Sequence, residues 1–347
     1  GLVAPDFTWE TVTQMDFGFD ASFLNNRLTG TFDWYRRNTK DMLVAGATLP
    51  ATLGASVPKS NSADMKTIGW ELSLGWNDRL ENGFSYWVKG VLSDYQATIT
   101  KYAGNDAGFY SQSDGDGKYY VGQKIGEIWG YHSNGLFQSD DEAATIDQSE
   151  LYAGKWGAGD VKYEDLDNDG KITKGEETIY NPGDKSIIGN KTPRYQFGIT
   201  VGFDYKNFDF EMFWQGTGKR DYMLSGAQFW GFTSQWDVPY TPALDYWTET
   251  NTDAYFPRPG WQNGGNRVTS DRYLQSAAYG RLKNLTVGYT IPKNLTTKWG
   301  ISRLRLYVTG ENLLTITPLN DAFDPETLGG MTYPINRKVA IGLNLTL

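Results

Sequence analysis

Apolar and polar side chains alternate along the chain in segments of about ten residues, which is the pattern of a β-strand with two different faces. In the first segment, Phe17 and Phe19 share one side of an extended chain, whereas Asp16 and Asp20 share the other. The same period of two is found in 15–23, 28–35, 68–76, 84–95, 195–205, 208–215, 285–291, 304–313 and 338–347. The sequence therefore predicts an all-β fold with nine strands.

The links between the predicted strands alternate strictly between short and long. Short links follow the first, third, fifth and seventh strands, at 24–26, 77–83, 206–207 and 292–302. Long links follow the second, fourth, sixth and eighth strands, at 45–64, 102–192, 219–275 and 317–336. An outer-membrane barrel has this asymmetry, because its periplasmic turns are tight and its extracellular loops are long.

We therefore predict a transmembrane antiparallel β-barrel whose apolar face contacts outer-membrane lipid and whose polar face lines a lumen. In this interpretation, 102–192 and 219–275 are two long extracellular loops. A β-sandwich or a propeller, in which the apolar face would be buried in a core, is the alternative that periodicity leaves open. The sequence contains no apolar stretch of the roughly 18 residues that a membrane-spanning helix needs.

The number and direction of the strands predict that residues 1–347 are the C-terminal part of a larger barrel. Bacterial single-chain barrels normally have an even number of strands and both termini in the periplasm. Here the first strand would enter from the extracellular side near Gly1, and the ninth would end at Leu347 in the periplasm. Because bare strand edges are not tolerated in lipid, we expect an N-terminal polypeptide to supply the remaining strands.

The composition excludes several classes of site and partner. The chain has no cysteine, which rules out disulfides, a thiol nucleophile and cysteine-bound metals. His132 is the single histidine, so the chain cannot combine several imidazoles, and no neighbouring residue marks it as a catalytic base. The net charge of −9 argues against a nucleic-acid partner, because such proteins normally carry a basic face.

A series of short motifs follows in order along the chain. They are Arg27–Tyr35, Thr39–Leu43, Gly69–Leu74, Gly159–Tyr163, Ile188–Asn190, Tyr279–Leu285, Leu306–Leu313, Phe323–Glu326 and Tyr333–Arg337. Their order and spacing resemble the C-terminal barrel region of SusC/RagA-type TonB-dependent outer-membrane transporters of Bacteroidetes. One departure is the final Leu347, where outer-membrane proteins usually end in an aromatic residue.

The resemblance implies a barrel of about 22 strands, of which this chain would supply the last nine. The plug domain and the TonB box would lie in the N-terminal part of the same transporter. It also implies a SusD-like surface lipoprotein as a lid, and energy delivered through TonB. Ligands in this family resemble oligosaccharides in most branches and peptides in some, and the barrel performs no bond chemistry.

An acidic stretch at 165–176 matches the calcium-loop pattern D-x-[DN]-x-[DN]-G-x5-E at every specified position. Calcium takes six to eight oxygen ligands, and Gly170 would allow the sharp turn that brings them together. The predicted ligands are Asp165, Asp167, Asp169, the carbonyl of Lys171, Thr173 and Glu176. An acidic, solvated turn without an ion is the alternative. A bound calcium ion would hold the loop 102–192 in one shape.

Aromatic residues are concentrated in the two longest links, among Gly, Asn, Asp and Gln. Sugars present apolar C–H faces and rings of hydroxyl groups, which fit flat aromatic rings beside amides and carboxylates. The candidate substrate-binding residues are Trp129, Tyr131, Trp230, Trp236, Trp247 and Trp261. Packing of each loop against itself is the alternative role for each of these rings.

Acidic residues on the polar face form a third set: Asp16, Asp20, Glu71, Asp204, Asp209 and Glu211. Paired carboxylates could serve a glycosidase, but the lining of an aqueous lumen explains them better, so we expect no enzyme activity. The sequence predicts a TonB-dependent importer of oligosaccharides. Import of peptides by the same mechanism and a secreted, calcium-binding β-sandwich that binds glycans are the alternatives.

Overall fold

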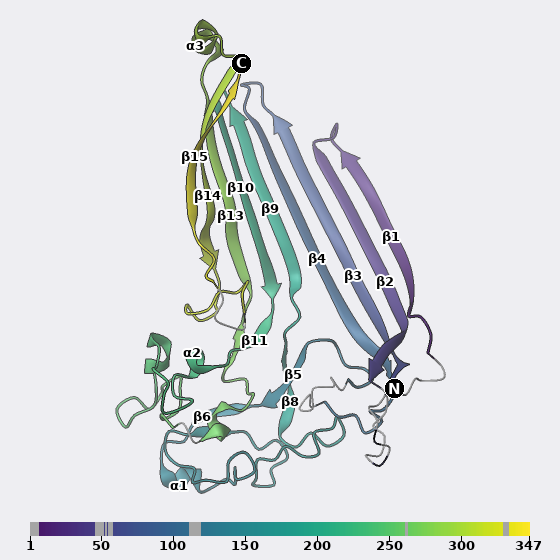
Figure 1. Cartoon of the computed structure of the whole chain (residues 1–347), viewed down its shortest axis with the longest axis vertical. Coiled ribbons are helices and arrows are strands. Elements are labelled where there is room, and N and C mark those ends of the chain that lie inside the picture. The colour runs from purple at the N-terminus through teal and green to yellow at the C-terminus, as the bar shows by residue number, and fades with distance from the viewer. Residues whose placement is uncertain are drawn as a thin grey trace.

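The computed structural model describes residues 7–45, 52, 54, 58–110, 119–260, 263–328 and 333–347. Nine strands form one large sheet, and every strand pairs antiparallel with its neighbours in the order of the chain (Figure 1). They are β1 (Thr11–Phe23), β2 (Leu28–Ala45), β3 (Lys59–Arg79), β4 (Ser85–Tyr102), β9 (Arg194–Tyr205), β10 (Phe208–Lys219), β13 (Tyr279–Thr290), β14 (Arg303–Ile316) and β15 (Lys338–Thr346). Each of the nine predicted strands corresponds to one of them.

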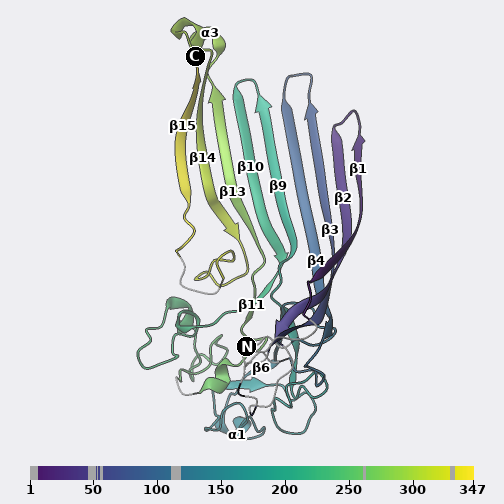
Figure 2. The same cartoon turned by 45° about the vertical axis from the view of Figure 1, so that its right-hand side comes forward.

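The turns and the long links lie at opposite ends of the sheet, as predicted. Figures 1 and 2 show the tight turns and the C-terminus at the top and the long links gathered below the strands. The sheet is open, with β1 and β15 at its two edges, which is consistent with part of a barrel. A single large sheet of this kind excludes the sandwich and propeller alternatives for the described residues.

Three strands are much longer than their alternation predicted. β2, β3 and β4 have 18, 21 and 18 residues, whereas β9, β10 and β13 have 12 each. A tilted strand crosses a bilayer in about 9–11 residues, so the longer strands project beyond it at the loop end. Residues 59–67 of β3 are mostly polar and carry no apolar signal, so the sequence placed the start of this strand at residue 68.

The two faces of the sheet have the predicted character. Directly opposed residues fall on the same face, and rows such as Val88, Val201, Met212 and Leu285 run across neighbouring strands. Many apolar side chains on this face are exposed: Met15, Phe17, Phe19, Phe23, Leu74, Val287, Leu306, Val308, Ile341 and Leu343. An exposed apolar face of this size needs an apolar solvent, which is the property of a membrane-spanning wall.

Aromatic rings lie flat over glycines on the polar face. Gly202 of β9 is opposite Trp87 of β4, and a Cβ atom added to Gly202 would overlap the indole. Gly342 of β15 is related in the same way to Tyr307 of β14. Covering a strand glycine with a ring from the neighbouring strand fixes the register and leaves a smooth wall.

The long links contain small elements of their own. Three two-stranded sheets pair β5 (Glu127–Tyr131) with β8 (Lys185–Asn190), β6 (Ser133–Leu136) with β7 (Val161–Tyr163), and β11 (Asp221–Met223) with β12 (Leu274–Ser276). Short helices are α1 (Asp140–Ala143), α2 (Ala227–Trp230), η2 (Thr241–Leu244) and η3 (Gly264–Arg267), while α3 (Lys293–Thr296) and η4 (Thr297–Trp299) lie at the turn end. Among the described residues, no helix has the length and apolarity to cross a membrane.

The main hydrophobic core lies in these links and not on the sheet. Residues from the links after β4, β10 and β14 pack together, with Phe229 of α2 in edge contact with Trp230, Phe256, Tyr273 and Phe323. The buried members are Tyr131, Leu136, Val161, Tyr163, Ile172, Leu224, Phe229, Trp230, Phe256, Tyr273, Ala277 and Leu319. We call this body the loop globule. It is a packed domain-like unit at the long-loop end of the barrel wall.

Candidate ligand and cation sites

A cavity of about 830 Å³ in the loop globule lies beside the β5–β8 pair. We call it the loop cavity. Its lining combines aromatic rings, an amide and charged side chains, including Tyr110, Trp129, Tyr131, Gln123, Tyr222 and Lys185. Trp129 and Tyr131 are alternate residues of β5, so their side chains leave the strand on the same side.

The aromatic wall of the loop cavity is built from stacked rings beside a lysine. The rings of Tyr110 and Trp129 stack with their centroids 4.1 Å apart and their planes 10° from parallel. The ammonium of Lys185 lies 5.8 Å from the ring centroid of Tyr110 and 5.4 Å from that of Tyr131, a cation–π arrangement. Burial, with a smaller effect of Glu177, raises the pKa of Tyr110 to about 12. The phenol is therefore neutral at physiological pH.

The charged groups around the loop cavity are largely paired with each other. Lys185 Nζ lies 2.8 Å from Glu177 Oε1, and Lys174 Nζ lies 4.0 Å from Glu150 Oε1. The carboxylate of Glu127 accepts a hydrogen bond from the hydroxyl of Tyr120 and one from a backbone N–H. Two ion pairs therefore engage four of the charged side chains that line the cavity, and aromatic rings form much of the remaining wall.

The six predicted aromatic residues have different environments. Trp129 and Tyr131 line the loop cavity. Trp230 is 8% exposed and packs in the core of the loop globule, where Trp247 contacts the same core. Trp236 is 84% exposed, and Trp261 lies outside the described residues. Packing against the core therefore accounts for Trp230 and Trp247, while Trp129 and Tyr131 face a cavity of ligand size.

The acidic stretch 165–176 folds into a tight turn around Asp165. The carboxylate of Asp165 accepts hydrogen bonds from the backbone N–H groups of Asn168, Asp169 and Gly170. Gly170 has a φ of +83°, a conformation that glycine adopts without strain. Of the predicted motif carboxylates, those of Asp165 and Asp167 offer oxygen atoms close to one centre.

A residue outside the predicted motif joins the acidic turn. Asp184 is fully buried and offers a carboxylate oxygen within 4.8 Å of oxygens from Asp165 and Asp167. Its carboxylate also accepts the backbone N–H groups of Leu166 and Thr173, which fixes its orientation. The predicted ligands Asp169 and Glu176 do not belong to this group of three. No spacing rule in the sequence points to Asp184, because it follows the motif.

The pKa values of two carboxylates in the acidic turn are shifted in opposite directions. Desolvation acts against ionisation of Asp165, but the backbone hydrogen bonds from Gly170, Asn168 and Asp169 lower its pKa. Desolvation and the negative charge of Asp169 raise the pKa of Asp167. A cation that neutralised the turn would relieve the unfavourable charge on Asp167.

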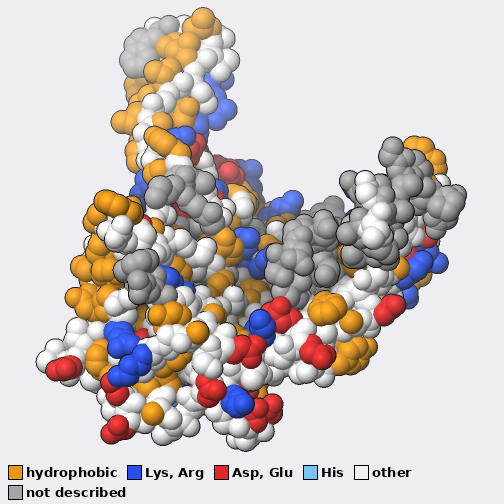
Figure 3. Space-filling view, turned by 60° about the horizontal axis from the view of Figure 1, so that its bottom comes forward, with side chains coloured by type: hydrophobic (Ala, Val, Ile, Leu, Met, Phe, Trp, Pro, Cys, Tyr) orange, Lys and Arg blue, Asp and Glu red, His pale blue; other side chains and the backbone are white. Residues whose placement is uncertain are grey.

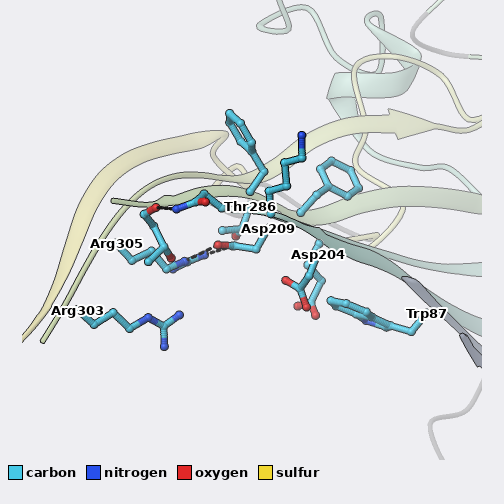
Figure 4. Close-up of a pocket in the computed structure, with 12 residues that line it drawn as sticks. Trp87, Asp204, Asp209, Thr286, Arg303 and Arg305 are labelled. Carbon is cyan, nitrogen blue, oxygen red and sulfur yellow. Dashed lines mark hydrogen bonds and ion pairs between the residues drawn. The ribbon is translucent and has the colours of Figure 1, made fainter. Parts of the chain in front are cut away.

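A second cavity, about 560 Å³, lies on the polar face of the sheet near the turn end (Figure 4). We call it the wall groove. Arg305 of β14 makes a two-pronged ion pair with Asp209 of β10, with 2.9 Å between Nε and Oδ1. Figure 4 shows Asp204 beside the indole of Trp87, and Arg303 on the near side of the groove.

The six predicted polar-face acids are spread along the wall and do not form one cluster. Asp204, Asp209 and Glu211 line the wall groove, and Glu71 lines a smaller cavity between β2, β3, β4 and β9. Asp20 accepts a hydrogen bond from the hydroxyl of Thr31 across the β1–β2 pair. Their distribution fits the polar lining of an aqueous lumen.

His132 has partners that sequence reasoning missed. Its Nδ1 lies 2.8 Å from Asp271 Oδ2, and its Nε2 lies 2.7 Å from Ser186 Oγ. Asp271 Oδ1 also accepts the backbone N–H of Ser133. The partners are 139 and 54 residues away in the sequence, so no local motif could reveal them. His132 joins the two long loops at the edge of the β5–β8 pair.

Comparison with known proteins identifies the family. Residues 2–313 match the family described as TonB dependent receptor-like, beta-barrel. The chain belongs to this family. Among curated relatives, it is 30% identical to TonB-dependent receptor P3 of Formosa agariphila over 99% of its length, and 26% identical to TonB-dependent receptor SusC of Bacteroides thetaiotaomicron over 97%. It spans 35% and 32% of those two proteins.

Solved structures of the same fold support this assignment. The chain matches the structure of the RagAB peptide transporter with a TM-score of 0.75, over 98% of this chain and 36% of that chain, at 22% identity. The match to the RagAB peptide importer in the open-open state has a TM-score of 0.72. The resemblance to SusC/RagA-type transporters seen in the sequence motifs is thereby confirmed.

Members of this TonB-dependent receptor family are outer-membrane proteins, so the sheet is a part of a barrel wall in that membrane. Its apolar face carries an aromatic cluster at the turn end, where Phe84 stacks on Phe203, Phe203 on Phe210, and Phe208 contacts Tyr289. Aromatic residues prefer the membrane–water interface, and tight turns face the periplasm. Both observations predict that the loop globule lies on the extracellular side.

Proposed function

We propose that residues 1–347 form the C-terminal part of the barrel of a TonB-dependent importer that carries oligosaccharides across the outer membrane. The family match and the nine-stranded wall support the transport role. Because the chain spans about a third of its curated relatives, the N-terminal part of the same transporter would supply the plug domain and the remaining strands. TonB would deliver the energy for import.

The loop cavity is the observation that favours oligosaccharides. Its wall presents the Tyr110–Trp129 stack and the amide of Gln123, while nearby charges are paired among themselves. Flat rings beside amides match the apolar faces and hydroxyl groups of a sugar. Peptides are the alternative ligands, because the RagAB transporter, which shares the fold at 22% identity, is a peptide transporter.

We also propose that a SusD-like surface lipoprotein docks on the loop globule. Trp236 and Val238 are 84% and 78% exposed, and Tyr240 and Leu244 are exposed beside them in the sequence. Protein interfaces are enriched in such aromatic anchors. Figure 3, seen from the loop end, shows further apolar patches between acidic and basic side chains.

Calcium is the proposed cation of the acidic turn. Asp165, Asp167 and Asp184 offer hard oxygen ligands around one centre, which is the donor set that calcium prefers. The role would be structural, because the turn lies between α1 and β8 in the loop globule and would tie these segments together. Asp184 would replace Glu176 as the residue that closes the site.

Uptake by the full-length transporter tests the proposed function. Cells lacking the transporter are complemented with wild-type protein, with Trp129→Ala or with the control Tyr180→Ala, whose side chain is exposed and does not line the loop cavity. Each strain is supplied with fluorescent maltoheptaose or with a fluorescent peptide mixture. We expect TonB-dependent uptake of the oligosaccharide, reduced only by Trp129→Ala. Uptake of peptides alone would overturn the proposed ligand class and keep the transport role.

A further inference from the structure

A small cavity in the loop globule contains a buried amide that is not satisfied by the protein. Asn263 is 9% exposed, and neither its Nδ2 nor its Oδ1 has a hydrogen-bond partner within the described part of the chain. Buried side-chain amides in folded proteins are almost always hydrogen-bonded. The Nδ2 donor and the Oδ1 acceptor of Asn263 can therefore both bind a group from outside the chain.

The walls of this cavity, which we call the Asn263 subsite, are mostly apolar. They consist of Trp230, Phe232, Phe256, Pro257, Pro259 and Gly260, together with the polar residues Arg258, Asn263, Asn266 and Arg267. The cavity volume is about 30 Å³, which admits a single group of about the size of a water molecule. The subsite can therefore take the tip of a ligand and not a whole sugar ring or residue.

The other polar side chains of the Asn263 subsite are already engaged. Arg258 and Asn266 both donate hydrogen bonds to the carboxylate of Asp160. Arg267 donates to a backbone carbonyl oxygen. These bonds hold the polar wall in place, and they leave Asn263 as the group in the subsite with both a donor and an acceptor to offer.

We propose that Asn263 recognises one ligand group that both donates and accepts a hydrogen bond, while the aromatic and proline walls pack against the carbon atoms beside it. A carboxamide presents its N–H donor and its C=O acceptor side by side. A sugar hydroxyl and a primary amide share this paired chemistry. The proposal rests on the proposed function, since it supposes that the imported ligand reaches the extracellular loops.

Small probes test the subsite without transport. Saturation-transfer NMR titrations of D-glucose and of glycinamide are recorded with the detergent-solubilised full-length transporter. Asn263→Leu removes both hydrogen-bonding groups, and the near-isosteric Asn263→Asp removes the donor and keeps the shape. The matched controls are Asn134→Leu and Asn134→Asp, because Asn134 is exposed in β6 and outside the cavity lining. Melting temperatures verify that all variants are folded.

We expect the Kd of D-glucose to rise about tenfold in Asn263→Leu, less in Asn263→Asp and not at all in the Asn134 variants. A loss confined to glycinamide would support the subsite with an amide as its natural group. The proposal is overturned if both probes bind wild type and Asn263→Leu equally, if neither binds the wild type, or if a structure at saturating probe shows only an ordered water at Asn263. None of these results depends on uptake, so a negative result would contradict the subsite without contradicting the import function.

Discussion

Arg258 makes a two-pronged ion pair with Asp160, and this pair joins the two longest loops. The distances are 2.9 Å from Nε to Oδ1 and 2.6 Å from Nη2 to Oδ2. Asp160 is fully buried and also accepts hydrogen bonds from the backbone of Gly157 and the amide of Asn266. A carboxylate in this position has all its partners inside the protein, so the loop globule depends on each of them.

Removal of the guanidinium should loosen the loop globule without unfolding the barrel wall. Arg258→Ala leaves the charge of Asp160 buried and half-satisfied, for which we expect a loss of about 3–5 kcal/mol in the free energy of unfolding of the globule. Limited proteolysis within 103–193 and 220–278 should accelerate accordingly. The control is Arg27→Ala, which breaks a half-exposed pair with Asp78 and should cost about 0–1 kcal/mol. Equal proteolysis of both variants would contradict the role of the buried pair.

The cation proposal makes a distinction between two acidic residues. If Asp184 closes the site, Asp184→Asn should weaken calcium binding by the full-length transporter far more than Glu176→Gln does. Chelation should speed proteolysis of the loop 103–193 in the wild type, while the melting temperature of the barrel stays the same. Isothermal titration with calcium chloride measures the affinities. A larger loss of calcium affinity in Glu176→Gln than in Asp184→Asn would favour Glu176, the ligand predicted from the sequence. If the chelator leaves the rate of proteolysis unchanged, the acidic turn holds no structural ion.

The contribution of Asp167 to the stability of the acidic turn should depend on pH in opposite ways with and without calcium. The pKa of Asp167 is raised from 3.8 in the folded protein, so protonation of this residue favours the folded turn. In chelator, this contribution is complete below pH 3.8 and is lost as the pH rises through the raised pKa. In calcium, the ion competes with the proton, and protection should instead fall as the medium becomes acidic. The contribution of Asp167 is measured as the difference in the free energy of unfolding of the loop globule between wild type and Asp167→Asn across pH 3–7. The comparison removes the effect of Asp165, whose lowered pKa acts in the opposite direction. Parallel trends of this difference in chelator and in calcium would contradict a bound cation.

The strands of this protein could be predicted from the sequence because lipid imposes a strict rule on them. In β10 and β14, the side chains that face lipid must be apolar, and these positions recur at every second residue. The predicted start of β3 was wrong, because residues 59–67 continue the strand beyond the membrane with polar side chains and show no apolar alternation. The alternation of short and long links likewise predicted that the long links gather at one end of the sheet.

The loop globule could not be predicted in the same way. Its core and its polar contacts join residues far apart in the chain, such as His132 with Asp271 and Val161 with Asn266. Trp230 and Trp129 stand in similar local sequences, Phe-Trp-Gly-Phe and Ile-Trp-Gly-Tyr, yet only Trp230 is buried in the core of the loop globule. The acidic motif at 165–176 could be recognised because its carboxylates are close together in the sequence. Asp184, whose carboxylate lies beside those of Asp165 and Asp167, was missed because it comes after the motif.

The ring of Trp87 over Gly202 gives a direct test of how the barrel wall is packed. In Gly202→Ala, the new Cβ would meet the indole, which must leave the wall or push the strands apart, at a cost of about 1–3 kcal/mol. Gly90→Ala is the matched control in β4, because a Cβ there meets no atom within 4 Å. The melting temperature of the full-length transporter in detergent should fall for Gly202→Ala and stay level for Gly90→Ala. The double variant Gly202→Ala with Trp87→Ala lacks the clash. If its melting temperature equals that of Trp87→Ala alone, the loss of stability in Gly202→Ala comes from this contact.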